Sequence, residues 1–509
     1  MAEYHVENFG CRASRSDGES IGANLRQSGL LPAAAPDSAD VVIVNTCSVT
    51  AEADRQARAY LRRVRRQNPG ARVIVTGCYA QRAPQEIAAL PEVDAVIGNS
   101  HKSLVAEIAL GLASRNKSVV LSAASELQHA SSARAEAIQT QVEEPALDLP
   151  AEIQSNPTFV PLARILHDDA FAHTELATLP FAPDARQTRP NLKVQDGCGN
   201  RCSFCIIPTT RGPSRSIPLA TCLDNVRRFV DNGGQELVVS GINLGRWGRD
   251  LNPAQRFEDL IAAILTETSL PRLRLSSIEP MDWSPDLLAL YREFSAGEDC
   301  SPNASLQPVT RNLQPVTCNL QPRLCRHAHL PLQSGSDTIL RRMHRRYRPW
   351  HYAERLSSIR ALLPDAAIGA DVMIGFPGET DALFEESYQF IAAQPFTYLH
   401  LFPFSARPHT PAWELHRQNP VPTRAVQERM AALRALMAEK SHTFRSSFLG
   451  RTLSAVTVEP GLNGTTEAVT DNFLKLTLAP QNAQSIPANR LVTARITHLT
   501  PEGLAGIAI

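Results

Sequence analysis

Three cysteines stand close together in the middle of the chain, in the order C-x3-C-x2-C. They are Cys198, Cys202 and Cys205, and they follow a short extended run at 192–195. Three thiolates this close in sequence can hold one iron–sulfur cluster and leave its fourth iron without a protein ligand. Because most cluster sites use four cysteines, a set of three indicates an iron that is kept open for another ligand.

A structural cysteine cluster and an incomplete zinc site are the alternative interpretations. Zinc normally needs a fourth Cys or His close by, whereas the next cysteine, Cys222, lies much further along the chain. Ten cysteines in 509 residues are also too sparse for a disulfide scaffold. Their tight spacing at 198–205 favours metal binding in a reducing compartment.

Three further cysteines follow predicted strands near the N-terminus. Residues 1–113 alternate β-rich runs with helical patterns, which predicts a parallel sheet covered by helices. Cys11, Cys47 and Cys78 each come just after one of these strands. Open α/β sheets assemble ligand sites at the carboxyl ends of their strands, so we expect the three thiols to meet at one crest. The alternative is inert packing, the usual role of a single buried cysteine.

Short motifs around both sets of cysteines resemble one enzyme family. The motifs are Asn8-Phe-Gly-Cys11, Asn45-Thr-Cys47, Thr76-Gly-Cys-Tyr-Ala-Gln81 and Asp196–Gly212. They are similar to those of the methylthiotransferases, a family of radical S-adenosylmethionine (SAM) enzymes. The resemblance implies two 4Fe-4S clusters and SAM as cofactors. One cluster, on Cys198, Cys202 and Cys205, would bind SAM and generate a radical, and the other, on Cys11, Cys47 and Cys78, would supply or carry sulfur.

The resemblance also implies SAM contacts in the central region. Asn232-Gly233-Gly234-Gln235-Glu236 is similar to the glycine-rich segment that meets the SAM amino group, and a glycine pair lets a backbone approach a ligand closely. On its own such a pair is more often a plain turn. Ser277 and Glu279, at the end of another predicted strand, offer polar groups for the SAM ribose or carboxylate.

Two arginine-rich runs are candidates for RNA contact. The first holds Arg341, Arg342, Arg345 and Arg346 together with Tyr347, which combines charge for phosphates with an aromatic ring for stacking. The second is the predicted helix 55–66, which carries six arginines. A solvated helix face is the alternative interpretation of either run. Since Lys+Arg and Asp+Glu balance at 51 each, affinity for RNA must come from local patches of this kind.

The element pattern and the resemblance predict an α/β protein with three domains. They are an N-terminal parallel α/β domain at 1–113, a central partial TIM-type radical SAM barrel at 188–440, and a small C-terminal all-β, TRAM-like barrel at 446–509. The small, polar and proline-containing stretch 114–187 predicts a linker or partly disordered insertion. A recurring Leu-Gln-Pro at about 298–324 predicts a low-complexity loop inserted in the barrel.

The resemblance implies an enzyme that replaces a C–H bond with C–SCH3. Polar acid–base catalysis acts poorly on such a bond, which is why a radical cofactor is needed. The motifs 194–198 and 240–250 are most similar to the branch that modifies N6-threonylcarbamoyladenosine beside the tRNA anticodon. The alternatives are the branches acting on isopentenyl-adenosine in tRNA or on an aspartate of a small-subunit ribosomal protein. A non-catalytic iron–sulfur protein that binds RNA is the alternative from another class.

The expected partners are tRNA and a reductant such as flavodoxin or ferredoxin. The N-terminus carries neither a basic segment nor an apolar one of the kind that directs secretion. No apolar run approaches the roughly 20 residues that a membrane helix needs. We therefore expect a cytoplasmic protein without a membrane partner. The C-terminal region holds four basic residues against four acidic ones, so its expected RNA role depends on the resemblance alone.

Overall fold

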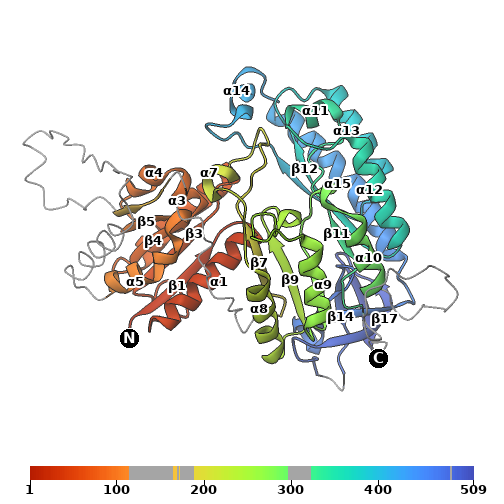
Figure 1. Cartoon of the computed structure of the whole chain (residues 1–509), viewed down its shortest axis with the longest axis horizontal. Coiled ribbons are helices and arrows are strands. Elements are labelled where there is room, and N and C mark those ends of the chain that lie inside the picture. The colour runs from red at the N-terminus through yellow and green to blue at the C-terminus, as the bar shows by residue number, and fades with distance from the viewer. Residues whose placement is uncertain (114–163, 169–170, 172–187, 296–321, 482–483) are drawn as a thin grey trace, which may run out of the picture. The chain divides into compact units, whose positions relative to one another are not determined.

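The computed structural model (Figure 1) describes residues 1–113, 164–168, 171, 188–295, 322–481 and 484–509. Its two compact units divide at His173/Thr174. The first unit holds Cys11, Cys47 and Cys78, and the second holds Cys198, Cys202 and Cys205. Each set of cysteines can therefore be described within its own fold.

The first unit is built on a parallel sheet in the order β2-β1-β3-β4-β5-β6. Its strands are β1 (Glu3–Asn8), β2 (Leu31–Pro32), β3 (Val41–Thr46), β4 (Arg72–Gly77), β5 (Ala95–Gly98) and β6 (Arg164–Leu166). Every residue of β3 is buried, and its Val-Val-Ile-Val run is typical of a strand covered on both faces. The expected parallel α/β domain is confirmed.

Helices cover both faces of this sheet (Figure 1). They are α1 (Arg12–Gln27), α2 (Ala51–Gln67), α3 (Cys78–Arg82), α4 (Pro84–Ala88), α5 (Val105–Ala113) and a 3₁₀ segment, η1 (Asn99–Leu104). Thr50 caps α2 by accepting a hydrogen bond from the Ala53 N–H at 3.2 Å, which satisfies one of the donors that a helix start leaves open. One apolar cluster includes Val42 and Leu61, and the other includes Ile43 and Leu25.

Part of the predicted linker belongs to this sheet. Arg164–Leu166 forms β6, which pairs in parallel with β5 through Ala95 opposite Arg164 and Ile97 opposite Leu166. The Gln81 side chain also donates to Asp168 O at 3.0 Å. The assignment of the whole of 114–187 to a linker is therefore wrong at 164–168, because this short Arg-Ile-Leu run has a buried strand edge to pair with. The rest of the segment, apart from residue 171, lies outside the described residues up to 187.

The second unit begins with six parallel strands that carry the central site (Figure 1). They are β7 (Asn191–Asp196), β9 (Glu236–Gly241), β10 (Arg272–Leu275), β11 (His327–His329), β12 (Ala367–Ile374) and β13 (Tyr398–Pro403). They form sheets ordered β10-β9-β7-β8 and β11-β12-β13, in which the short β8 (Arg215–Ser216) is antiparallel to β7. A parallel bridge from Leu273 to Leu324 joins the two sheets. The arrangement is the expected partial barrel.

Helices follow the strands and cover the outside of the partial barrel. They are α7 (Ile207–Arg211), α8 (Leu219–Asp231), α9 (Phe257–Glu267), α10 (Pro285–Phe294), α11 (Asp337–Arg342), α12 (Pro349–Leu362), α13 (Asp381–Ala393), α14 (Pro411–Gln418) and α15 (Thr423–Ser446), with 3₁₀ turns η3 (Leu244–Arg246) and η4 (Pro280–Asp282). One large apolar cluster runs from Leu192 on β7 to Met437 on α15. The strands are thereby held so that their carboxyl ends meet on one side.

The chain ends in a closed five-stranded barrel in the order β14-β15-β16-β18-β17. Its strands are β14 (Thr452–Pro460), β15 (Thr466–Thr470), β16 (Lys475–Leu478), β17 (Leu491–Leu499) and β18 (Leu504–Ala508), with a 3₁₀ turn, η5 (Leu462–Gly464). Closure leaves no open sheet edge. The predicted all-β domain is confirmed, with the short β18 as a strand that the sequence pattern did not predict.

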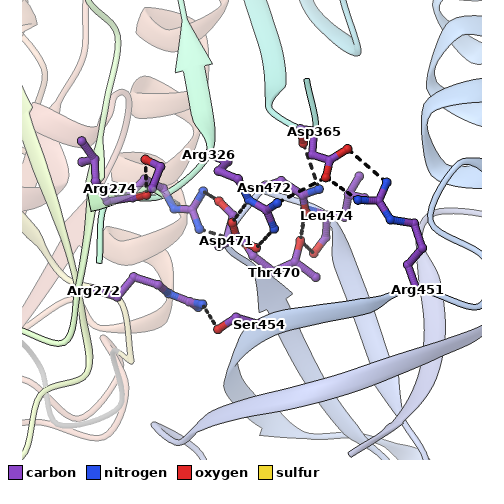
Figure 2. A network of polar contacts seen from close by, with 12 residues as sticks. Arg272, Arg274, Arg326, Asp365, Arg451, Ser454, Thr470, Asp471, Asn472 and Leu474 are labelled. Atoms are coloured by element: carbon purple, nitrogen blue, oxygen red, sulfur yellow. Dashed lines mark hydrogen bonds and ion pairs between the residues drawn. The ribbon is translucent and has the colours of Figure 1, made fainter. Parts of the chain in front are cut away.

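The C-terminal barrel packs against the amino ends of the core strands (Figure 2). Arg274 donates from Nη2 to Thr470 O at 2.9 Å and from Nη1 to Asp471 O at 3.1 Å. Arg326 forms an ion pair with Asp471, Nε to Oδ2, at 2.6 Å. Arg451 of the barrel pairs with Asp365, which precedes β12. Most of the contacts drawn in Figure 2 are charge-assisted, and such bonds are about twice as strong as neutral ones.

The predicted low-complexity insertion leaves and rejoins the core at one place. Residues 296–321 lie outside the described part of the chain, but their flanks are described. The N–H groups of Arg323 and Leu324 both donate to Phe294 O at 3.0 Å, and Ser295 Oγ donates to Leu324 O at 2.8 Å. Cys325, just after the insertion, is a buried core residue of the second unit. None of the helices in the described part is long and apolar enough to span a membrane.

Candidate active site

The loop that carries Cys198 leaves the carboxyl end of β7, and Gly197 makes the turn into it. Gly197 has a φ of +72°, and a Cβ there would lie 1.9 Å from the carbonyl oxygen of Pro213. Only glycine fits such a left-handed and closely packed position. The Cys198 N–H then donates to Gly212 O at 3.0 Å. The cysteine loop is thereby closed against the segment that leads to β8.

Two buried polar side chains at the end of β7 fix the path of this loop. Asp196, 1% exposed, accepts from the Gly197 N–H at 2.8 Å and from Arg211 Nη1 at 2.9 Å. The fully buried Gln195 accepts from the Asn243 N–H at 2.8 Å and donates to Gly197 O at 2.7 Å. Breaking a buried ion pair leaves one charge without a partner, at high cost. The loop therefore starts in a fixed direction.

The segment after α11 holds the middle of the same loop. The buried Ser203 donates from its N–H to Met343 O at 3.1 Å and from Oγ to Arg342 O at 2.7 Å. Its carbonyl accepts from the Ala412 N–H at 2.9 Å. Ser203, one of the two residues between the second and third cysteines, is thus bonded to two distant parts of the core, and the thiols on either side stay partly exposed.

Each of the three cysteines of the loop is partly exposed. Cys198 Sγ accepts from the Asn200 N–H at 3.4 Å and from Asn243 Nδ2 at 3.6 Å. Cys202 Sγ accepts from Arg345 Nη1 at 3.3 Å. Burial raises the pKa of Cys198, and it raises the pKa of Cys205 to about 12. Without a metal these two thiols stay protonated at neutral pH, and a metal that binds them must displace the protons.

This donor set fits an iron–sulfur cluster with one open iron. The three sulfurs come from one short loop, and N–H donors from Asn200, Asn243 and Arg345 point at two of them. Hydrogen bonds of this kind to cluster sulfurs help to set reduction potentials. The thiols and the N–H donors around them are therefore the kind of ligands and neighbours that an iron–sulfur cluster takes.

Beyond the loop, polar side chains from β11, β12 and β13 form one layer of the partial barrel. Ser277 Oγ lies 2.7 Å from His329 Nδ1. Asp371 Oδ1 lies 3.6 Å from His329 Nε2 and 3.3 Å from His400 Nδ1. One ligand-type atom from each of His329, Asp371 and His400 lies within 4.8 Å of the other two, and the contact between Asp371 and His400 is a hydrogen bond. Ser277 therefore faces this histidine layer. Glu279 lies closer to the cysteines, because its carboxylate accepts from Arg345 Nη2 at 2.5 Å.

In the first unit, Cys11, Cys47 and Cys78 lie at the carboxyl ends of β1, β3 and β4. These strands are adjacent and in parallel register, with Asn8 opposite Asn45 and Asn45 opposite Thr76. The expected meeting of the three strand ends at one crest is what the sheet order produces. Cys47 and Cys78 are buried, whereas Cys11 is exposed.

Two glycines let these strand ends approach each other closely. A Cβ on Gly10 would lie 2.4 Å from Cys47 Cβ, and one on Gly77 would lie 2.3 Å from Thr46 O. Both glycines have positive φ, +112° and +97°. Asn99 Nδ2 donates to Cys78 Sγ at 3.4 Å. Three thiols that follow neighbouring strand ends, one of them with an amide donor beside it, also fit a cluster with three protein ligands.

Comparison with known proteins shows the family to which the chain belongs. Residues 3–98 match the model of Uncharacterized protein family UPF0004, and residues 192–391 match that of the Radical SAM superfamily. The chain is 30% identical over 482 residues to the threonylcarbamoyladenosine tRNA methylthiotransferase MtaB of Bacillus subtilis (strain 168). The alignment covers 94% of this chain and 90% of the relative. The chain belongs to the radical SAM methylthiotransferase family.

Methylthiotransferases with another substrate in their name are about as similar. The tRNA-2-methylthio-N(6)-dimethylallyladenosine synthase of Salinispora arenicola (strain CNS-205) is 30% identical over 464 residues, with 89% of this chain and 76% of the relative covered. Among solved structures, the radical SAM methyltransferase TsrM from Kitasatospora setae aligns with a TM-score of 0.50 at 13% identity, over 82% of this chain and 76% of that one. That likeness shows the fold. Radical SAM methylthiotransferases use [4Fe–4S] clusters and SAM.

The structure places Gly233, Gly234 and Glu236 away from the cysteine loop. They lie at the amino end of β9, whereas Cys198 follows the carboxyl end of the parallel β7. Glu236 is fully buried, and Gly233 O accepts from Asn489 Nδ2 of the C-terminal barrel at 3.0 Å. A SAM contact by these three residues is at odds with this placement, because catalytic groups of such barrels gather at the opposite strand ends.

The cysteine loop is reached instead by Gly241–Asn243, at the carboxyl end of β9 and just after it. A Cβ on Gly241 would lie 3.1 Å from Gln195 Cβ, and Asn243 contacts Cys198. Asn243 was not among the residues expected at the site. The signal was present in the sequence, since the glycine pair precedes the predicted strand whereas Gly241 and Asn243 follow it. Strand direction was the better guide than the likeness of the Gly-Gly pair.

The arginine run at 341–347 divides into exposed and buried residues. Arg341, Arg342 and Arg346 are exposed, so they can still reach RNA. Arg345 is 8% exposed and Tyr347 is 1% exposed. The expectation that Tyr347 stacks on a base is wrong, because its ring is in the core and its hydroxyl donates to Pro331 O and Leu332 O at 2.7 and 2.8 Å.

The arginines of α2 also divide. Arg58 pairs with Glu86 at 2.9 Å and Arg65 with Asp94 at 2.8 Å, so these two hold the first unit together. Arg62, Arg63 and Arg66 are exposed. The predicted solvated face and the predicted phosphate contacts are both compatible with these three arginines.

Proposed function

We propose that this enzyme converts N6-threonylcarbamoyladenosine next to the anticodon of tRNA into its 2-methylthio derivative. The observation that carries the proposal is the presence of three cysteines at strand ends in one unit and three on one loop in the other, in a chain about 30% identical to relatives named for this reaction in Bacillus subtilis and Aquifex aeolicus. Insertion of sulfur into a C–H bond needs a radical source and a sulfur source. Two separate cluster sites supply that division of labour.

In this proposal Cys198, Cys202 and Cys205 hold the cluster that faces SAM. When bound, that cluster supplies the electron that cleaves SAM and so provides the radical that abstracts hydrogen. The chain's own part is to hold the three thiolates on a loop fixed by Asp196 and Gln195, with Asn243 and Arg345 donating to the sulfurs.

Cys11, Cys47 and Cys78 then hold the second cluster, which supplies or carries sulfur, and a second SAM provides the methyl group. Glu279 and the backbone at Gly241 lie on the cysteine side of the core and are the proposed SAM contacts. Ser277 contacts His329 of the histidine layer. A low-potential electron donor of the flavodoxin or ferredoxin class completes the set of partners.

Exposed Arg341, Arg342 and Arg346 are proposed to contact tRNA phosphates, which is the usual role of accessible arginines near RNA. They follow or end α11, in the segment that also bonds to the cysteine loop through Ser203. RNA held there would lie next to the thiols. The four-against-four balance of charges gives the C-terminal region no net positive charge.

The substrate is tested by mass spectrometry of tRNA nucleosides from a strain that lacks this gene. Loss of 2-methylthio-N6-threonylcarbamoyladenosine, restored by the intact gene, supports the proposal. Its persistence in a strain with no other methylthiolating enzyme overturns it. The dimethylallyladenosine synthases among the relatives make that nucleoside the second candidate. Loss of its 2-methylthio form in place of the first would select it.

The division of labour is tested on the reconstituted enzyme with SAM and dithionite. Cys202→Ala should form no 5′-deoxyadenosine, whereas Cys47→Ala should form it but leave tRNA without a methylthio group. Cys222→Ala is the matched control, because this buried cysteine packs on α8 outside both loops. Equal loss of cleavage in the first two variants would contradict the assignment. Failure of the intact enzyme to cleave SAM would favour a non-catalytic iron–sulfur protein.

A further inference from the structure

One arginine of the 341–348 run is turned inward, unlike its exposed neighbours. Arg345 is 8% exposed, while Arg341, Arg342 and Arg346 are exposed. A guanidinium is rarely buried unless it is paired. Its partners therefore indicate what this arginine does in the site.

The guanidinium of Arg345 is held by three groups from three parts of the core. Nη1 donates to Cys202 Sγ at 3.3 Å, Nη2 donates to Glu279 Oε2 at 2.5 Å, and Nε donates to the Tyr347 hydroxyl at 3.1 Å. The planar fork of arginine spreads its donors over three nitrogens and can meet three separated acceptors, a geometry that the single ammonium nitrogen of lysine does not reproduce. The contact with Cys202 is the only one of the three that involves a thiol.

The support of Arg345 is itself rigid. Tyr347 is 1% exposed, and its hydroxyl donates to Pro331 O and Leu332 O while it accepts from Arg345. The Arg345 guanidinium also lies over the Tyr347 ring, 4.9 Å from its centroid. With Glu279 as counter-ion on the other side, the cation cannot leave Cys202 without breaking several buried contacts.

We propose that Arg345 is a positioning residue that fixes the Cys202 thiolate and raises the reduction potential of the cluster held by Cys198, Cys202 and Cys205. The proposal rests on the proposed ligand role of these cysteines. Uptake of one electron from the external reductant adds one negative charge to the cluster. A fixed cation that donates an N–H to a ligand sulfur stabilises this more negative state, so the electron is accepted at a higher potential.

A purely structural role for Arg345 predicts something different. It would lower stability or cluster content when the residue is replaced, and leave the potential of the loaded cluster unchanged. The potential is therefore the decisive measurement. The SAM-responsive part of the electron paramagnetic resonance signal identifies the cluster concerned, and the cluster at Cys11, Cys47 and Cys78 serves as an internal reference in the same protein.

The experiment is a redox titration of the full-length, reconstituted enzyme, followed by electron paramagnetic resonance with and without SAM. Arg345→Gln should lower the ratio of reduced to oxidised SAM-responsive cluster about tenfold at a fixed potential, which corresponds to about 59 mV. Arg345→Lys keeps the charge but loses the fork, and should show a smaller shift in the same direction. Arg341→Gln is the control for the potential, since this arginine is exposed and pairs with Asp337.

An unshifted potential in Arg345→Gln with full iron content overturns the proposal. If that variant does not take up its cluster, Arg345→Lys decides the matter by the same criterion. An equal shift of both clusters also overturns it, because the effect would then not be local to Cys202. Failure of the proposed function would instead show in the unmodified enzyme, as the absence of any SAM-responsive signal.

Discussion

The two ends of the core strands each bury arginine beside glutamate, and they use the pair differently. At the amino ends, Glu236 is fully buried and forms ion pairs at 2.8 Å with both Arg272 and Arg274. At the carboxyl ends, Arg345 is buried but the side chain of Glu279 is 24% exposed. The first site is surrounded by protein on all sides, and the second remains partly open beside a thiol.

The difference shows what separates a structural ion pair from a functional one. Arg272 and Arg274 use their remaining N–H groups on Ser454, Val469, Thr470 and Asp471 of the C-terminal barrel. Arg345 uses one of its own on Cys202. All three arginines are buried and carry the same charge, so the identity of the last acceptor separates their roles. Four predictions test this comparison.

Loss of the central carboxylate should have the largest effect on stability. Glu236→Gln leaves the buried guanidinium groups of Arg272 and Arg274 and the half-buried one of Arg189 without their counter-ion. We expect the free energy of unfolding to fall by about 3–5 kcal/mol, measured by denaturant titration of the second unit's transition. Asp231→Asn, on the exposed end of α8, should change it by less than about 0.5 kcal/mol. Equal effects would show that Glu236 is not the centre of the network.

Loss of one arginine should loosen the C-terminal barrel. Arg274→Met removes the bonds to Thr470 O and Asp471 O and one of the ion pairs of Glu236, which keeps Arg272 and Arg189. It should cost about 2–3 kcal/mol, typical of hydrogen bonds that involve a charge. Hydrogen exchange should quicken in 452–508 and stay unchanged in 1–113. The exposed Arg495→Met, on β17, is the matched control. Unchanged protection in the barrel would mean that the other contacts suffice to hold it.

The same change at the carboxyl ends should be mild for stability. Glu279→Gln keeps an acceptor for Arg345 and is partly solvated, so we expect a loss of about 1 kcal/mol in the free energy of unfolding. The larger consequence should be a weaker affinity for SAM, measured by equilibrium binding to the reconstituted enzyme. A stability loss as large as that of Glu236→Gln would remove the distinction between the two ends.

Acidification should reduce the stabilisation from Glu236 only at a pH below the ordinary pKa of a glutamate. Burial alone would raise the pKa of Glu236, but the charges of Arg274, Arg189 and Arg272 outweigh it and hold the pKa well below the ordinary value. The stabilisation from Glu236 is therefore complete above the unfolded pKa of about 4.3 and is lost as the pH falls through the lower folded pKa. Between pH 8 and pH 5 the stability difference between wild type and Glu236→Gln should stay constant in parallel unfolding titrations.

Much of this architecture could be predicted from the chain. Apolar runs such as Val41–Val44 predict the buried strands of a parallel sheet. The cysteines that follow these runs are then expected at the carboxyl ends of the strands. Which arginines of the 341–348 run are buried and which are exposed could not be predicted in the same way. Arg345 and Arg346 are neighbours with identical local signals, and only the tertiary contacts with Cys202 and Glu279 separate them. The same holds for Glu236, whose partners lie on β10 and just before β7.

The flanks of the 296–321 segment have a consequence for engineering. Because Phe294 O accepts from both Arg323 and Leu324, the chain is already closed at the base of this excursion. The entropy of closing a loop grows only slowly with its length, by about 0.6 kcal/mol for each doubling. The stability of the core therefore depends little on the length of the segment inserted there. A fluorophore, an affinity tag or a short glycine bridge in place of 296–321 would leave the strand ends, and the cysteines they carry, where they are.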